Sequence, residues 1–251
     1  WGVQRKNIKL VDREGVVYEG REKMNQYLEP YAHKTKNRTM EEALVDADIF
    51  FGLSAAGVLK PEALQTMAKN PIIFAMANPT PEIMPDLAKE VRPDAIIGTG
   101  RSDFPNQINN VLGFPYLFRG ALDCGAKEIN TEMKIAAAEA LADLARKTAD
   151  ARLSSAYKGQ KLKFGPEYLI PKPFDPRLLG VVASAVAKAA AKTGVATRPI
   201  EDMDSYVHKL DASLDQSFSL MRSIMNQARK HPMRVVFPEG EDERVIRAAQ
   251  V

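Results

Sequence analysis

Short apolar runs recur along the first half of the chain, each bounded by residues that favour turns. Three of them, residues 48–53, 72–77 and 95–99, read as buried strands of a parallel sheet. Helix-start signals precede two of these runs: a capping box from Thr39 to Glu42, and Pro61 followed by an acid. This alternation predicts an α/β fold, a Rossmann-type parallel sheet flanked by helices.

The second half of the chain is patterned for helices. Met133, Ala137 and Leu144 fall on one face of a helix capped by Asn130 or Thr131. A proline-rich extended segment at residues 166–176 follows. An Ala-rich helix ending at Gly194 comes next, with an apolar stripe at Leu178, Val182, Val186 and Ala189. Its small residues would allow close packing, within the subunit or against a partner.

A change of character follows Pro199. Apolar residues at Leu214, Phe218, Met221 and Met225 recur at helical spacing. This stretch is either a helix packed on its own domain or a linker helix. Residues 234–238 then predict a new strand and residues 243–250 a helix, which together would open a second domain. We expect the chain to be a fragment of a longer protein.

Composition narrows the classes of partner. The 251 residues are 45% hydrophobic and 27% charged, which is ordinary for a globular chain that buries a core. A formal net charge of +3, with the charges interspersed, argues against a nucleic-acid partner. A helix that spans a bilayer needs about 20 apolar residues, and no apolar stretch approaches that length, so we expect no membrane-spanning segment and no membrane partner. The single cysteine, Cys124, can form no internal disulfide, which suits the cytoplasm.

Candidate ligand-binding residues follow the ends of the apolar runs, where open α/β sheets bind their ligands. Asn78 ends the central run, and its amide is both donor and acceptor. Ser54 and Ala55 are small enough for a backbone to approach a ligand, although they also suit a tight turn. Asn109 and Asn110 either cap a helix, the commoner role, or direct an amide into the same cleft as Asn78.

Asp12 ends a shorter apolar run at residues 8–12. In a dinucleotide-binding fold, an acid at the end of the second strand accepts hydrogen bonds from the ribose, about 20 residues after a Gly-rich loop. An acid shortly before a glycine such as Gly15 is also an ordinary turn. Arg13 and Arg21 are candidates for binding a 2′-phosphate, but a solvated basic surface is the default interpretation.

Residues for proton transfer and metal binding are not recognisable. His33, His208 and His231 lack metal-ligand spacing, and the chain has no nucleophile elbow and no phosphate loop. We therefore expect a cofactor cleft with no catalytic residue and no metal ligand in this chain.

Longer motifs carry a resemblance that covers nearly the whole chain. Four segments strongly resemble bacterial NADP-dependent malic enzymes: VDREGVVYEGR at 11–21, FAMANPTPEI at 74–83, RPDAIIGTGRSDFPNQINNVLGFPYLFRGALD at 92–123 and FGPEYLIPKPFDPRLLG at 164–180. The ending MRVVFPEGEDERVIRAAQ, at 233–250, is similar to the start of a phosphotransacetylase-like domain. The chain thus looks most like the hybrid type of malic enzyme.

The resemblance implies a function for the intact enzyme. Malate would be oxidised with reduction of NADP, and a bound Mg²⁺ or Mn²⁺ would assist decarboxylation to pyruvate. Asn78 would contact the nicotinamide side of the cofactor, Asn110 would contact the cofactor, and Asn78, Asn109 and Asn110 would bind the substrate. Ser54 and Ala55 would lie near the adenosine half. Asp12 would bind the ribose, which ordinarily favours NAD and leaves the choice of cofactor open. The catalytic residues and metal ligands would lie upstream, so this chain alone should be inactive.

The resemblance also implies an organisation into segments and an assembly. We expect the C-terminal part of the NAD(P)-binding domain at 1–129, a helical segment completing the malic enzyme domain at 130–210, a linker helix at 211–232 and the start of the second domain at 233–251. A cytoplasmic homo-oligomer, a dimer or larger, with an acyl-CoA effector is expected. The alternatives are a non-catalytic assembly module that senses acyl-CoA, and another NAD(P)-dependent dehydrogenase.

Overall fold

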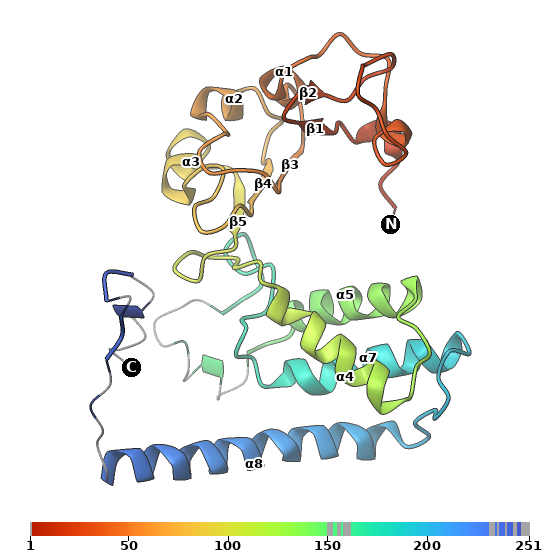
Figure 1. The fold of residues 1–251 in the computed structure, drawn as a ribbon, viewed down its shortest axis with the longest axis vertical. Helices are drawn as coiled ribbons and strands as arrows, with labels where there is room; N and C mark the ends of the chain where they lie inside the picture. The colour runs from red at the N-terminus through yellow and green to blue at the C-terminus, as the bar shows by residue number, and fades with distance from the viewer. Residues whose placement is uncertain are drawn as a thin grey trace. The chain divides into compact units, whose positions relative to one another are not determined.

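The structure is a computed structural model that describes residues 2–149, 153–154, 157, 162–230, 234, 236–238, 240–242 and 245–246 (Figure 1). The chain divides into two compact units, Trp1–Ile200 and Glu201–Val251. All the candidate site residues belong to the first unit.

A three-stranded parallel sheet lies in the first unit. It contains β3 (Ile49–Gly52), β4 (Ile72–Ala75) and β5 (Ile96–Thr99), in the order β3-β4-β5. The register pairs Gly52 with Ala75 and Ala75 with Thr99, so the three carboxyl ends lie level. The predicted parallel α/β sheet, with its most apolar run in the middle, is confirmed.

Among the described residues, the two faces of this sheet differ in how well they are covered. Phe50, Ile73 and Ala75 point into a core that they share with residues in or beside α1 (Met40–Leu44), α2 (Pro61–Gln65) and α3 (Pro85–Val91). On the opposite face Ile49 is 52% and Phe51 62% exposed. β3 is therefore open on one face, whereas no residue of β4, the central run, is exposed, and β5 ends in two buried residues.

The first short strand has a different role from the predicted one. β1 (Val11–Asp12) pairs antiparallel with β2 (Gly15–Val16) in a hairpin of its own, and two 3₁₀ turns, η1 (Arg5–Asn7) and η2 (Glu29–Tyr31), flank it. It does not join β3, β4 and β5. The tight turn favours this pairing: Gly15 has a φ of +100°, and a side chain there would overlap the carbonyl oxygen of Arg38.

Several helices follow β5 in the first unit. They are η3 (Asn110–Leu112), α4 (Phe114–Asp123), α5 (Thr131–Arg146) and α7 (Arg177–Lys192), as Figure 1 shows. The predicted cap of α5 is confirmed, because Asn130 accepts a hydrogen bond of 3.0 Å from the backbone N–H of Met133. The predicted apolar stripe of α7 is buried at Leu178, Val182 and Val186.

The second unit contains the long helix α8 (Met203–Lys230). The helix predicted around Leu214 is thus confirmed, but it begins before residue 211. The strand predicted at 234–238 is wrong for the residues described there, because 234 and 236–238 form no strand. The helix predicted at 243–250 falls mostly outside the described residues, and its two described residues, 245 and 246, are helical. In the described part of the chain, no helix has the length and hydropathy needed to cross a membrane.

Candidate functional site

The carboxyl edge of the sheet exposes three of the expected residues. Ser54 and Ala55 lie just beyond β3, Asn78 lies just beyond β4, and all three are exposed. Because β3 and β4 are parallel neighbours, the two loops leave the sheet at the same edge. The peptide bond between Asn78 and Pro79 is cis. This edge therefore presents an amide, a hydroxyl and small residues to a ligand.

A buried glutamate joins these two loops, and sequence reasoning missed it. One carboxylate oxygen of Glu82 accepts hydrogen bonds from the backbone N–H of Ser54, at 2.8 Å, and from its hydroxyl, at 3.1 Å. The other oxygen accepts from the backbone N–H of Ala77, at 3.0 Å. Glu82 is fully buried. The available signal was an acid in a stretch that is otherwise largely apolar and proline-rich.

The loop beyond β5 is held by a second buried polar residue, Asn106. Its amide nitrogen donates to the carbonyl oxygens of Ile97, at 2.9 Å, and Pro166, at 2.7 Å. Its amide oxygen accepts from the backbone N–H of Leu169, at 2.8 Å. The proline-rich segment is thereby fixed beside the loop that leads to Asn109 and Asn110.

The two adjacent asparagines differ in their contacts. Asn109 caps η3 by accepting a hydrogen bond of 3.0 Å from the backbone N–H of Val111, so the capping interpretation is confirmed for it. Asn110 is exposed, and its side chain makes no hydrogen bond among the described residues. Its amide is therefore available to a ligand.

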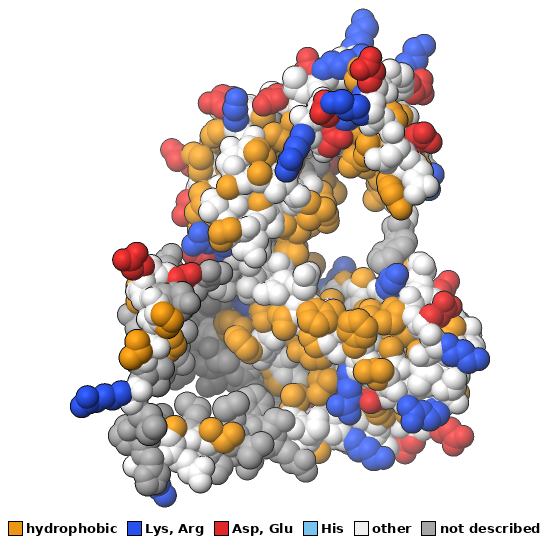
Figure 2. All heavy atoms as spheres, viewed as in Figure 1, with side chains coloured by type: hydrophobic (Ala, Val, Ile, Leu, Met, Phe, Trp, Pro, Cys, Tyr) orange, Lys and Arg blue, Asp and Glu red, His pale blue; other side chains and the backbone are white. Residues whose placement is uncertain are grey.

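Both asparagines border a hollow of about 490 Å³ in the surface. Its lining residues are Asn109, Asn110, Leu112, Gly113, Phe114, Leu141 and Ile170. Figure 2 shows hydrophobic side chains over α4 beside this region, and Phe114 and Phe118 are about half exposed. Asn78 is not among the lining residues, so a single cleft shared by Asn78 and the other two asparagines stays a prediction.

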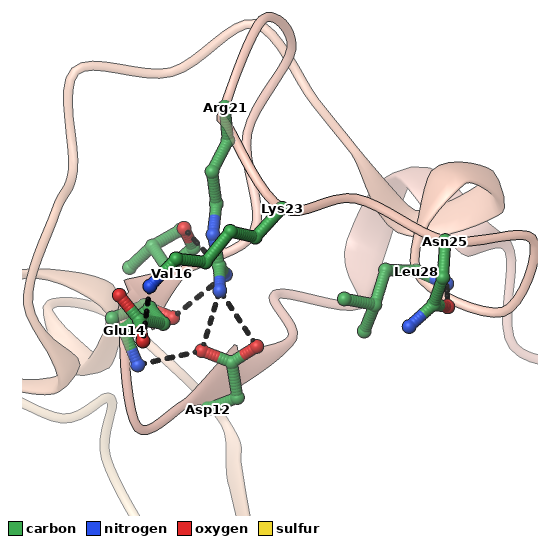
Figure 3. Close-up of polar contacts among 8 residues, drawn as sticks. Asp12, Glu14, Val16, Arg21, Lys23, Asn25 and Leu28 are labelled. Carbon is green, nitrogen blue, oxygen red and sulfur yellow. Dashed lines mark hydrogen bonds and ion pairs between the residues drawn. The ribbon is translucent and has the colours of Figure 1, made fainter.

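Asp12 has an internal partner (Figure 3). Both of its oxygens accept hydrogen bonds of 2.8 Å from the guanidinium of Arg21, and one also accepts from the backbone N–H of Glu14. Partial burial would raise the pKa of Asp12, but these hydrogen bonds and the charge of Arg21 outweigh it and lower the pKa. Asp12 remains ionised and partly exposed, which suits an acceptor for a ribose hydroxyl.

Arg21 is not part of a solvated basic surface. It is 9% exposed, and besides Asp12 it donates to the carbonyl oxygens of Gly15 and Val16. The default interpretation is therefore wrong for Arg21, because the hairpin turns its guanidinium inward. Arg13 is exposed.

Near the hollow, several ionisable side chains are shifted by burial. Burial, with the charge of Asp175 in addition, raises the pKa of the Tyr116 and Tyr168 phenols. Burial also lowers the pKa of Lys172. Asp175 is itself paired with Arg177 at 2.6 Å. The two phenols therefore stay neutral at pH 7, and the buried hydroxyl of Tyr168 has no hydrogen-bond partner among the described residues.

The donor set at the sheet edge fits a nicotinamide nucleotide but not a metal ion. Amide, hydroxyl and backbone groups match the carboxamide and ribose hydroxyls of such a nucleotide. Among the described residues, no group of three or more His, Cys, Asp or Glu side chains could hold a metal ion.

Two known protein families match the chain. The family described as the malic enzyme NAD-binding domain matches residues 3–156. The chain belongs to the malic enzyme family. Residues 219–251 match a second family, the phosphate acetyl/butaryl transferases.

Curated malic enzymes match the whole length of the chain. The chain is 56% identical over 252 residues to a protein of Rhizobium meliloti named NAD-dependent malic enzyme, covering 100% of this chain and 33% of that protein. It is 55% identical to a protein of Salmonella typhimurium named NADP-dependent malic enzyme, covering 99% of this chain and 33% of that one. The chain thus spans about a third of the length of these relatives.

Solved malic enzyme structures share the fold. The crystal structure of the Entamoeba histolytica malic enzyme aligns with a TM-score of 0.71 at 31% identity, covering 94% of this chain and 47% of that one. The malic enzyme of Pyrococcus horikoshii aligns with a TM-score of 0.65 at 35% identity, covering 83% of this chain and 44% of that one. The Rossmann-type α/β fold is confirmed.

Proposed function

We propose that the protein containing this chain converts malate to pyruvate and CO₂ with reduction of NADP. The observation that carries the proposal is the malic enzyme NAD-binding match over residues 3–156. A parallel sheet whose carboxyl edge exposes Ser54 and Asn78 supports it. Two relatives that are 55% identical to the chain support it further, since both are named NADP-dependent malic enzyme.

The residues of this chain would bind and orient rather than transfer protons. NADP, when bound, would accept the hydride that leaves C2 of malate. The Asn78 amide would hold the nicotinamide side, and the Asn110 amide would hold cofactor and malate, with Asn109 fixing the turn from which Asn110 projects. Keeping the two reactants in a near-attack geometry lowers the entropic part of the barrier.

The adenosine half would lie along the other loops. Ser54 and Ala55 would approach it through the backbone, and Asp12 would accept hydrogen bonds from its ribose. Because Arg21 is engaged by Asp12, a 2′-phosphate would depend on Arg13 or on residues outside this chain. Named relatives use either cofactor, so NAD stays an alternative to NADP.

The remaining parts of the reaction would come from the rest of the protein. A divalent ion, Mg²⁺ or Mn²⁺, and the acid and base residues are proposed to lie outside this chain. Residues 1–129 and 130–210 would complete the malic enzyme domain, residues 211–232 would link it onward, and residues 233–251 would begin the transferase-like domain. The match at residues 219–251 supports a transferase-like part at this end of the chain, although it begins within the proposed linker.

The experiment is malate-dependent reduction of NADP by the full-length protein with Mg²⁺, followed by identification of the product. We expect absorbance at 340 nm to rise and pyruvate to accumulate in equal amount. The 27.7 kDa chain alone should show no turnover. No turnover by the full-length protein with either NADP or NAD would contradict the proposal.

A second candidate function is regulation through acyl-CoA in a cytoplasmic homo-oligomer. It rests on the match of residues 219–251 to the phosphate acetyl/butaryl transferases. Calorimetry of the full-length protein with acetyl-CoA, and light scattering for its mass, test the effector and the assembly separately. A monomer that binds no acetyl-CoA would remove this candidate.

A further inference from the structure

We infer that Glu82 is the positioning residue of the proposed nucleotide cleft, because its carboxylate holds the loop beyond β3 and the loop beyond β4 at once. The inference deepens the proposed function and rests on it. Glu82 is not itself placed against the nucleotide. It acts through Ser54 and through Ala77, the residue before Asn78.

The setting of Glu82 is unusual for an acid. It is 0% exposed, and among the described residues no Lys, Arg or His side chain pairs with it. Asp175, the other buried acid among the described residues, does pair with a cation, the guanidinium of Arg177. A buried acid without a cation is costly unless donors surround it. Here two backbone N–H groups and one hydroxyl supply them.

The contacts of Glu82 lie at the ligand end of both loops. Farther along, the loops are joined by backbone bonds from Gly57 to Pro81, at 3.1 Å, and from Leu59 to Glu82, at 3.0 Å. These bonds join the later parts of the two loops, which lead toward α2 and α3. At the end of the sheet, the backbone N–H of Met76 also donates to the carbonyl oxygen of Gly52, at 3.2 Å. Beyond that bond, the parts of the two loops that carry the exposed Ser54 and Asn78 are held together by the carboxylate.

The end of β3 is shaped to admit this carboxylate. A Cβ atom added to Gly52 would lie 2.6 Å from the carboxyl carbon of Glu82 and 2.7 Å from one of its oxygens. A larger residue at position 52 would therefore displace the carboxylate from Ser54. Gly52 leaves the space that the Glu82 carboxylate occupies, although 30 positions separate the two residues.

The Glu82→Gln substitution tests the inference with little change of shape. All three described partners donate to the carboxyl group, and a glutamine presents one acceptor and one NH₂ donor. In either orientation its NH₂ group would face the backbone N–H of Ser54 or of Ala77. One of the two loops would lose its attachment.

The experiment compares full-length wild type, Glu82→Gln and the control Glu90→Gln, an exposed acid on α3. For Glu82→Gln we expect the Kd of NADP, measured by calorimetry, to rise about tenfold, since a buried donor is left unpaired. Amide exchange at Ser54 or Ala77 should become faster in the cofactor-free protein. The control should match the wild type in both measurements.

The outcomes separate this inference from the proposed function. If the wild type binds NADP but does not oxidise malate, the proposed function is refuted. The Kd of NADP and the amide exchange rates at Ser54 and Ala77 would still test the role of Glu82. If wild type binds no nicotinamide nucleotide, function and cleft are both wrong. A Glu82→Gln protein with a lower Tm but an unchanged Kd would mean that Glu82 only stabilises the fold, which overturns the inference.

A milder variant covers the case in which Glu82→Gln does not fold. Ser54→Ala removes only the hydroxyl bond of 3.1 Å to Glu82. Because the same carboxylate holds the neighbouring loop, amide exchange at Ala77 should accelerate in this variant. Unchanged exchange at Ala77 would overturn the coupling of the two loops.

Discussion

Three asparagines within five positions have three different roles. Asn106 is 3% exposed and makes three hydrogen bonds to backbone groups. Asn109 caps a turn, and Asn110 projects into solvent beside the hollow. The amide group is the same in each case. Burial and neighbouring backbone groups decide whether it stabilises the fold or stays available to a ligand.

This difference gives a prediction for Asn109 and Asn110. Asn110→Ala should lower kcat/KM for malate about tenfold or more, through a higher KM and a lower kcat, since a ligand hydrogen bond is lost. Its free energy of unfolding should change by no more than about 0.5 kcal/mol. Asn109→Ala should instead destabilise the protein by about 1 kcal/mol through loss of the cap.

Steady-state kinetics and thermal melts of the full-length variants make the comparison. Unchanged kinetics in Asn110→Ala would exclude a role for its amide in binding.

Residue-scale features were predictable from sequence when their partners are close along the chain. The capping box of Thr39 and Glu42 and the Asn130 cap involve partners three residues apart, and both are confirmed. The contacts of Glu82 with Ser54 span 28 residues and those of Asn106 with Leu169 span 63. No local pattern marks such partners, because folding alone brings them together.

At the scale of elements, α4 and α7 approach each other unusually closely. A Cβ atom on Gly120 of α4 would overlap the carbonyl oxygen of Ala183 in α7 and would lie 3.0 Å from the Cβ atom of Val186. The small residues predicted to favour close packing of α7 therefore serve contacts within the subunit. The matching glycine on α4 was not anticipated, since a glycine inside a helix ordinarily weakens it.

Gly120→Ala tests which effect is larger. Alanine would favour the helix by about 1 kcal/mol, but overpacking against a backbone carbonyl costs about 1–3 kcal/mol. We predict a net destabilisation of up to about 2 kcal/mol, measured by urea unfolding. Lys188→Ala, an exposed change on α7, should stay within about 0.5 kcal/mol of wild type. A stabilised Gly120→Ala protein would contradict the close approach.

Strand pairing shows the limit of prediction at this scale. The parallel pairing of β3, β4 and β5 was predicted from apolar runs alternating with helix signals, but their order in the sheet was not. The short run ending at Asp12 was assigned to the same sheet because apolarity does not reveal a strand's partner. The turn at Gly15 instead closes a hairpin, which satisfies the backbone locally.

At the scale of the whole molecule, the sheet is exposed along one side of β3, at Ile49 and Phe51. Parallel sheets are normally covered on both faces. Here Phe51 packs edge-on against Phe74, with ring centroids 6.3 Å apart, yet remains 62% exposed. Since the chain spans about a third of its relatives, we propose that other parts of the protein cover this face.

Phe51→Asp tests this coverage in the full-length protein. A charge placed under a covering layer should lower stability by about 2 kcal/mol or more, measured by thermal unfolding. Tyr27→Asp, which alters an aromatic residue that is 74% exposed in a loop, should have little effect. Equal stability of Phe51→Asp and wild type would mean that the face stays open to water.

The hydrogen bonds of Asn106 have a consequence for how the protein is made. Its partners Pro166 and Leu169 follow it by 60 and 63 residues. During synthesis, β3, β4 and β5 can pair as soon as Thr99 has left the ribosome, since chains fold from the N-terminus. The loop bearing Asn109 and Asn110 has to wait for Leu169. A nascent chain stalled before that residue would carry a finished sheet and an unfinished binding site.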